Sequence, residues 1–266
     1  MKQEKSSRIG NESIDSGATV LKIPKLADPE LQQQSLTAAR DSWWMFNIIA
    51  EMVTAADKLA AVAPAVAIFG SARMKEGHPY YTLTEQIARK LSDSGFSVVS
   101  GGGPGLMEAA NKGAAAGNSP SVGLNILLPF EKGGNGFQDV SLTFQHFFAR
   151  KVMFVKSAGA YVVMPGGFGT LDELTEALTL IQTRKILQFP IVLMGRDYWA
   201  PFLAMLRTMV EAGTISAADL DLMLVTDSVP DAVAHLEQYA VQHFGLKRRK
   251  APRASRWLGE KAMPTR

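Results

Sequence analysis

The sequence predicts an α/β fold: a Rossmann-like, doubly wound parallel sheet with helices on both faces, plus an N-terminal helix. From Ala65 onward, short apolar segments alternate with amphipathic stretches, which is typical of βαβ units. The apolar segments are nearly continuous, as expected of strands that are covered on both faces. Glycine turns follow three of them, at 70–71, 101–105 and 166–170, where ligands bind in such sheets.

The first expected element is a helix over residues 38–61. Trp43, Trp44 and Phe46 give it a large apolar surface, so we expect it to pack on the main domain or on a second subunit. The strands that follow are expected at 65–69, 96–100, 121–125, 160–164, 191–194 and 222–225. The helices between and after them are expected at 80–94, 105–116, 145–158, 171–184, 199–212 and 231–243.

These elements form one nucleotide-binding domain, residues 36–245, between two tails. Residues 1–35 are polar and without periodicity, which predicts disorder. Residues 246–266 form a basic tail, in which Lys247, Arg248, Arg249, Lys250, Arg253 and Arg256 lie close together. No nucleic-acid-binding motif accompanies this tail, so a solvated segment is favoured over a specific nucleic-acid contact.

Composition excludes several classes of site. The chain has 266 residues, 47% of them hydrophobic, a net charge of +3 and no cysteine, so disulfides and thiolate metal sites are impossible. The four histidines show no metal-binding spacing, and we expect neither a metal nor a cofactor. No apolar segment approaches the roughly 20 residues that span a bilayer, and we expect a cytoplasmic protein without membrane partners.

The glycine turn formed by Gly166, Gly167 and Gly169 lies between a strand-like and a helix-like segment. Such a turn brings backbone close to a ligand and directs free N–H groups and the positive helix end at an anion. Thr170 is expected to cap the helix and to contact a phosphate oxygen. Glu173 follows one helical turn later, so a carboxylate beside a phosphate site suggests chemistry on a phosphorylated sugar.

A second glycine turn contributes Gly102, Gly103 and Gly105 as candidate phosphate-binding residues. The turn fits neither the dinucleotide fingerprint G-x-G-x-x-G nor the G-K-[ST] ending of a P-loop. A monophosphate is therefore favoured over a dinucleotide or a triphosphate. The alternative is a purely structural turn with Pro104 at the first position of a helix.

Five further polar residues are candidates for the substrate site. Arg150 and Lys151 interrupt an apolar helical segment, and arginine suits a two-pronged contact with phosphate. Ser71 and Arg73 follow the first strand, and Asn125 ends the third, where it could hydrogen-bond base or ribose. For Glu173 a structural alternative exists, because Thr170 and Glu173 match the capping box T-x-x-E.

The chain resembles the LOG family of cytokinin-activating nucleoside 5'-monophosphate phosphoribohydrolases. The family motif PGGxGTxxE is matched in full at 165–173, the Arg-Lys pair at 150–151, and a glycine-rich turn at 101–107. The likeness extends from about residue 65 to 226, and the chain's length and the segment 69–73 resemble the longer bacterial branch. The resemblance implies catalytic roles for Arg150 and Glu173, a supporting role for Lys151, and Met107 near the base.

The expected activity is hydrolysis of the N-glycosidic bond of a nucleoside 5'-monophosphate, giving free base and ribose 5-phosphate. The family also implies a homodimer or larger homo-oligomer. Molybdenum-cofactor carriers look similar, so the alternative is a protein that binds a phosphorylated ligand without hydrolysing it. A lysine decarboxylase is disfavoured because no Schiff-base lysine and pyridine partner stand out.

Overall fold

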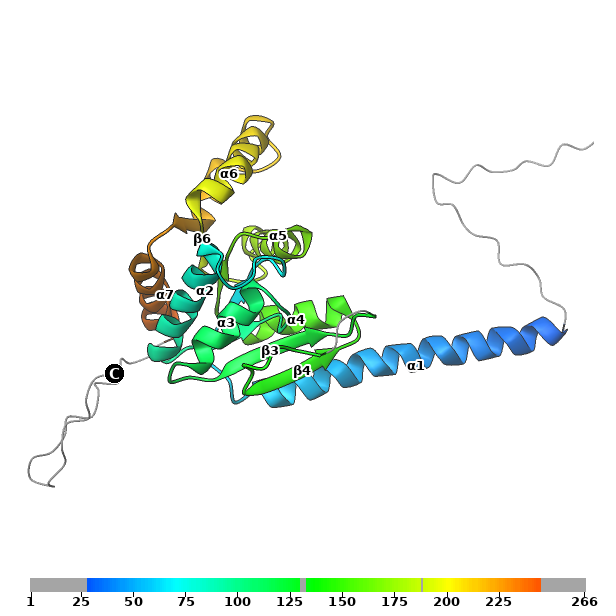
Figure 1. Ribbon diagram of the computed structural model, residues 1–266. Helices are drawn as coiled ribbons and strands as arrows, with labels where there is room; N and C mark the ends of the chain where they lie inside the picture. Colours follow the sequence, from blue (N-terminus) through cyan, green and yellow to red (C-terminus); the bar gives the residue numbers. More distant parts are fainter. Residues whose placement is uncertain (1–27, 130–132, 188, 245–266) are drawn as a thin grey trace, which may run out of the picture. The chain divides into compact units, whose positions relative to one another are not determined.

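The computed structural model describes residues 28–129, 133–187 and 189–244 (Figure 1). The predicted basic tail, 246–266, lies outside these residues, as does the predicted N-terminal tail up to residue 27. The chain divides after Phe46 into two units. The division of the chain into the segments 1–35, 36–245 and 246–266 stays a prediction.

Helix α1 (Asp28–Leu59) begins ten residues before the start expected from the apolar pattern. In the second unit its last turns are anchored by Ala55 and Leu59, which are buried in the core. Glu51, on the same stretch, accepts one hydrogen bond from the backbone N–H of Gln145 and is paired with the His146 ring. Trp43 and Trp44 are exposed, and their expected packing on the main domain or on a second subunit stays a prediction.

The second unit contains a seven-stranded sheet whose neighbouring strands are all parallel, in the order β4-β3-β2-β1-β5-β6-β7. This arrangement confirms the predicted fold class. The strands are β1 (Ala65–Phe69), β2 (Ser97–Ser100), β3 (Ser121–Ile126), β4 (Val140–Phe144), β5 (Ala160–Val163), β6 (Ile191–Met194) and β7 (Met223–Thr226). The sequence missed β4, an edge strand in which exposed and buried residues alternate.

Helices cover both faces of the sheet (Figure 1). They are α2 (Pro79–Asp93), α3 (Leu106–Ala115), α4 (Phe147–Ser157), α5 (Phe168–Gln182), α6 (Arg196–Glu211) and α7 (Val229–Phe244), with a short 3₁₀ helix at Ala217–Leu222. Successive side chains of β1 point to opposite faces. Ala67 and Phe69 therefore join one core, with α4 and α5, while Val66 and Ile68 join the other, with α2, α3 and α7.

The order of the strands creates a switch point between β1 and β5. From β1 the chain moves outward through β2, β3 and β4, and then returns to β5 on the other side of β1. In open α/β sheets the crevice beyond the carboxyl ends of the strands at such a point is the usual place for a ligand. The turns after β1, β2 and β5 all begin at the carboxyl ends of these strands, beside this crevice.

Candidate functional site

A cavity of about 640 Å³ lies at the switch point, beyond the carboxyl ends of β1, β2 and β5. Its walls are built from the turn after β1 (residues 69–74), the start of the turn after β2 (Gly101) and the turn into α5 (residues 166–171). The remaining lining residues are Met107, Arg150, Glu173 and Tyr198. The two predicted catalytic residues thus meet in one cavity with most of the PGGxGTxxE motif.

The turn into α5 leaves three backbone donors unsatisfied. The helix begins at Phe168 with Gly167 as its N-cap, and the N–H of Thr170 donates to the Gly167 carbonyl oxygen at 3.1 Å. The N–H groups of Gly167, Phe168 and Gly169 make no hydrogen bond to any residue that the structure describes. Three adjacent donors at the positive end of a helix can hold an anion such as a phosphate group.

The expected capping role of Thr170 is wrong. Because α5 begins three residues earlier than the sequence indicated, Thr170 lies inside its first turn, and the N-cap Gly167 has no side chain. Thr170 instead packs tightly against Gly166, where an added Cβ would collide with the Thr170 Oγ1 atom. Glycine is therefore required at 166 for this close approach, and the Thr170 side chain is fixed at the edge of the cavity.

Glu173 has no structural partner among the described residues. A capping box would need its carboxylate to accept from the Thr170 N–H, but that N–H donates to Gly167. The side chain is only 6% exposed, and its Oε2 atom is buried without a hydrogen bond to any described residue. A buried carboxylate without a partner destabilises the fold, which points to a role in binding or chemistry.

Burial raises the pKa of Glu173 to about 7. Desolvation is the largest cause, and the positive charges of Arg150 and Lys151 oppose it without cancelling it. The carboxylates of Asp172 and Glu176 raise this pKa further. A carboxyl group with a pKa near neutrality can exchange a proton with a substrate or a water molecule at physiological pH.

Arg150 reaches the cavity from α4. Its guanidinium carbon lies 5.6 Å from the centre of the Phe147 ring and 5.5 Å from that of Phe154, so two aromatic rings orient it. One terminal nitrogen lies 3.6 Å from the position that a Cβ on Gly101 would occupy. The cation therefore lies against the second glycine turn, in the same cavity as the Glu173 carboxylate.

Lys151, the neighbour of Arg150, does not line the cavity. Its ammonium group is paired with Asp172 at 2.8 Å and with Glu176 at 3.0 Å. Burial lowers the pKa of Lys151, but the hydrogen bonds and charges of the two carboxylates outweigh it, and the net shift is upward. Lys151 thus ties α4 to α5 and adds positive potential near Glu173, without lining the binding cavity.

The second glycine turn lines the cavity only at Gly101 and through Met107. The predicted binding residues Gly102, Gly103 and Gly105 are not part of the lining. The Gly102 carbonyl accepts hydrogen bonds from the side chains of Asn135 and Gln138. The structure therefore supports a structural role for those three glycines. The expected place of Pro104 is wrong, because α3 begins at Leu106 with Gly105 as its N-cap.

Gly105 allows the turn after β2 to pack closely against the turn after β1. Its φ angle is +70°, and an added Cβ would lie 2.5 Å from the Ser71 carbonyl oxygen, which also accepts from the Leu106 N–H at 2.9 Å. We expect Gly105→Ala to lower the free energy of unfolding by about 2–4 kcal/mol. The matched control is Gly77→Ala, where φ is +93° but no atom lies within 4 Å, so only about 1 kcal/mol is expected to be lost. Equal losses in urea denaturation would show that the contact with Ser71 is unimportant.

Asn125 lies outside the cavity lining, contrary to its expected contact with base or ribose. Its amide nitrogen donates to the Gln138 side chain at 3.0 Å, to the Ser141 hydroxyl at 2.9 Å and to the Leu142 carbonyl at 3.1 Å. The residue is 4% exposed. It connects β3 with the edge strand β4 and with the loop before it, which is a structural role.

Ser71, Arg73 and Met107 line the cavity as expected. Ser71 accepts a hydrogen bond on its hydroxyl from the Arg73 N–H at 3.1 Å, and this bond shapes the turn after β1. Phe168 and Tyr198 are among the lining residues that were not expected from the sequence. Phe168 is the variable position of the PGGxGT motif, and it is 93% exposed. Tyr198 lies on α6 and belongs to none of the sequence motifs that predicted the site.

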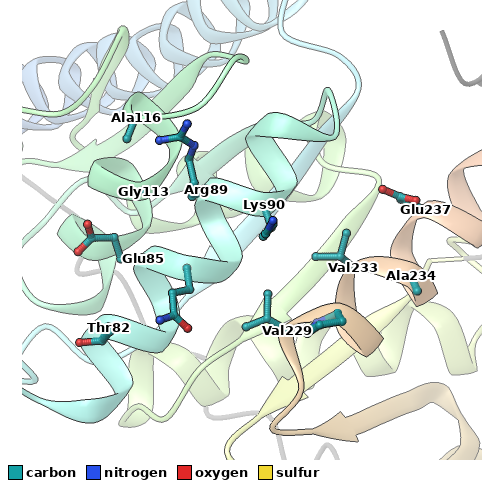
Figure 2. Close-up of a pocket in the computed structure, with 12 residues that line it drawn as sticks. Thr82, Glu85, Arg89, Lys90, Gly113, Ala116, Val229, Val233, Ala234 and Glu237 are labelled. Atoms are coloured by element: carbon teal, nitrogen blue, oxygen red, sulfur yellow. The ribbon is translucent and has the colours of Figure 1, made fainter. Parts of the chain in front are cut away.

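A second groove, of about 740 Å³, lies between α2, α3 and α7 (Figure 2). Its apolar wall includes Val229 and Val233, and its polar wall includes Glu85 and Arg89. Two of its charged groups are engaged locally, since Arg89 is paired with Asp93 at 2.9 Å and Glu85 with Lys112 at 3.4 Å. Nothing at this groove resembles the unsatisfied donors and buried carboxylate of the switch-point cavity.

The part of the chain that the structure describes contains no cluster of three or more His, Cys, Asp or Glu side chains arranged to hold a metal ion. Within the same residues, every helix is too short or too polar to cross a membrane.

Comparisons with known proteins find relatives in sequence and in fold. A family model described as "Possible lysine decarboxylase" matches residues 107–236. A probable cytokinin riboside 5'-monophosphate phosphoribohydrolase of Oryza sativa subsp. japonica is 30% identical over 164 residues. That match covers 60% of this chain and 66% of the relative, so the chain spans just under two thirds of the relative's length. A cytokinin riboside 5'-monophosphate phosphoribohydrolase of Arabidopsis thaliana is 27% identical over 182 residues, which are 67% of this chain and 84% of that protein.

Among solved structures, the molybdenum cofactor carrier protein of Chlamydomonas reinhardtii has a similar fold. The TM-score is 0.50 and the identity 21%, over 67% of this chain and 98% of that one. The similarity is one of fold alone. Taken with the complete PGGxGTxxE motif at the switch-point cavity, the sequence matches show that the chain is similar to proteins of the LOG family.

Proposed function

We propose that the protein is a nucleoside 5'-monophosphate phosphoribohydrolase, which splits the N-glycosidic bond to give a free base and ribose 5-phosphate. The observation that carries the proposal is the buried carboxylate of Glu173, which lacks a structural partner and lies one turn from three free N–H donors. A phosphate bound at the start of α5 would place the attached ribose toward Glu173. The relatives named as phosphoribohydrolases support the same class of reaction.

In the proposed reaction, the bond between C1' and the base nitrogen breaks and the electron pair leaves with the base. Positive charge grows on C1' as this bond lengthens, and the ionised Glu173 carboxylate stabilises it. A water molecule then forms the new C1'–O bond and gives a proton to Glu173, whose pKa of about 7 suits that step. The leaving nitrogen takes a proton from solvent, and Glu173 then releases its own proton to solvent, so that one water molecule is consumed per bond broken.

Arg150 has a binding role in this scheme. Arginine stays charged near neutral pH and is a poor proton donor. Its guanidinium, held over two rings beside Gly101, would instead bind the substrate and balance the negative charge of the phosphate. Asp172 is unsuited to protonate the leaving base, because its carboxylate is paired with Lys151 and does not line the cavity.

The phosphate is expected to contribute strongly to turnover, because it supplies binding energy that orients the ribose. We expect kcat/KM for AMP to exceed that for adenosine by ~10³-fold or more, measured as free adenine released. Adding inorganic phosphate should inhibit AMP cleavage competitively. Equal efficiency on the monophosphate and the bare nucleoside would contradict a phosphate site at the start of α5.

A carrier of a phosphorylated ligand, such as the molybdenum cofactor, is the alternative with the same fold. A carrier needs the three N–H donors but has no use for a buried carboxylate with a pKa near neutrality. The two functions differ in outcome, since a carrier would retain its ligand in stoichiometric amount without forming a product. Glu173 therefore favours the enzyme.

A lysine decarboxylase remains disfavoured. Pyridoxal phosphate chemistry requires a lysine that forms a Schiff base, and no lysine is among the residues described as lining the cavity. The preferred base, cytokinin or otherwise, the cytoplasmic location and the homodimer stay predictions.

A further inference from the structure

Tyr198 touches the phosphate-binding turn from a different part of the chain. It is the third residue of α6, which follows β6, the strand next to β5. Its hydroxyl donates a hydrogen bond of 2.6 Å to the carbonyl oxygen of Gly166, the residue just before the N-cap of α5. The same side chain lines the cavity and is 40% exposed.

The neighbouring Trp199 fixes the position of Tyr198. The Trp199 ring is 1% exposed, and its N–H donates to the Met194 carbonyl oxygen at 3.0 Å, which ties the start of α6 to the end of β6. The Tyr198 ring packs edge-on against it, with centroids 5.2 Å apart and an interplanar angle of 87°. The Tyr198 hydroxyl is therefore held in place before any ligand binds.

The hydrogen bond sets the orientation of one peptide group. In a planar trans peptide the C=O and the following N–H point in opposite directions. When Tyr198 binds the Gly166 carbonyl, the N–H of Gly167 must face away from Tyr198, as one of the three free donors at the start of α5. Two adjacent glycines would otherwise let this peptide rotate at little cost.

We propose that Tyr198 is a positioning residue for the anion site, which holds the Gly166–Gly167 peptide so that the α5 donors converge on the substrate's 5'-phosphate. The inference rests on the proposed function, because it assigns the phosphate to those donors. Tyr198 acts through the backbone and takes no part in the bond-breaking step. Its loss should therefore weaken binding of every phosphorylated ligand and leave chemistry on the bound substrate largely intact.

The test is Tyr198→Phe, which removes the hydroxyl and keeps the ring packed on Trp199. We expect the Kd for ribose 5-phosphate, measured by calorimetry on the full chain, to rise ~5–10-fold. The KM for AMP should rise by a similar factor, while kcat should change less than 3-fold. The matched control is Tyr239→Phe on α7, which removes a hydroxyl outside the cavity and should leave Kd, KM and kcat unchanged.

A second variant, Tyr198→Trp, keeps an aromatic ring with an N–H donor but places that donor elsewhere, and it should weaken ribose 5-phosphate binding to a similar extent. If wild type binds ribose 5-phosphate and both Tyr198 variants bind it equally well, the positioning role is overturned and the proposed function stands. If wild type binds neither ribose 5-phosphate nor AMP, the phosphate site itself is wrong, and the role of Tyr198 falls with it. A fall in kcat at unchanged KM would also contradict positioning of the phosphate.

Discussion

Replacing Glu173 with glutamine is expected to lower kcat for nucleoside monophosphate cleavage ~10²–10⁴-fold while leaving the fold intact. Glutamine has nearly the same shape, but it can neither accept a proton from water nor stabilise positive charge on C1' with a full negative charge. Binding should change little, because the phosphate is assigned to the backbone donors of α5 and not to this carboxylate. The measurement is free base released per enzyme under saturating substrate.

The matched control is Glu176→Gln, the same chemical change three residues later on α5. Glu176 is paired with Lys151 and does not line the cavity, so we expect kcat within about 3-fold of wild type. Ribose 5-phosphate affinity should be retained in both variants, which shows that the cavity is still formed. A Glu173→Gln enzyme with a near-wild-type rate would remove the carboxylate from the mechanism.

The second large expected effect is that ionisation of Glu173 lowers the free energy of unfolding of the protein. In the unfolded chain Glu173 ionises near pH 4.5, while in the folded chain its pKa is about 7. Between these values the folded protein keeps a proton that the unfolded chain has lost, so its free energy of unfolding falls as the pH rises through this window. Above pH 7 the buried charge costs ~3 kcal/mol, and below pH 4.5 the cost disappears.

Glutamine carries no charge to desolvate, so Glu173→Gln should be more stable than wild type by up to ~3 kcal/mol at pH 8 and nearly equal to it at pH 4.5. Urea denaturation of both proteins at the two pH values measures the difference, and Glu176→Gln serves again as the control. A gain that is the same at pH 4.5 and pH 8 would mean that packing, not burial of charge, causes it. A substitution that stabilises the fold but removes activity is what we expect at a residue that is retained for function.

The apolar segments predicted the fold well because strands buried on both faces need almost no polar residue. β1 and β6 begin and end where the pattern indicated. β4 was missed because an edge strand exposes alternate residues, and Val140–Phe144 contains only two fully buried side chains. The pattern therefore predicts the centre of such a sheet more reliably than its edge.

The site was predicted less completely because the spacing of residues in the sequence does not determine the direction in which each side chain points. Thr170 looked like a cap, since threonine is a common N-cap, yet the glycine before Phe168 starts the helix. Lys151 lies next to Arg150 in sequence, but one residue along a helix turns the side chain by roughly 100°, toward Asp172 instead of the cavity. Tyr198 comes from a helix that follows the next strand, and only the sheet order brings it to Gly166.

The most direct test of the account is to incubate the purified protein with a panel of nucleoside 5'-monophosphates and to measure free base and ribose 5-phosphate, with Glu173→Gln in parallel. The account predicts the two products in equal amounts from at least one monophosphate with wild type, and almost none with the variant. If the folded wild-type protein binds these nucleotides but releases no base from any of them, hydrolysis is contradicted, and a ligand carrier becomes the better description of the site.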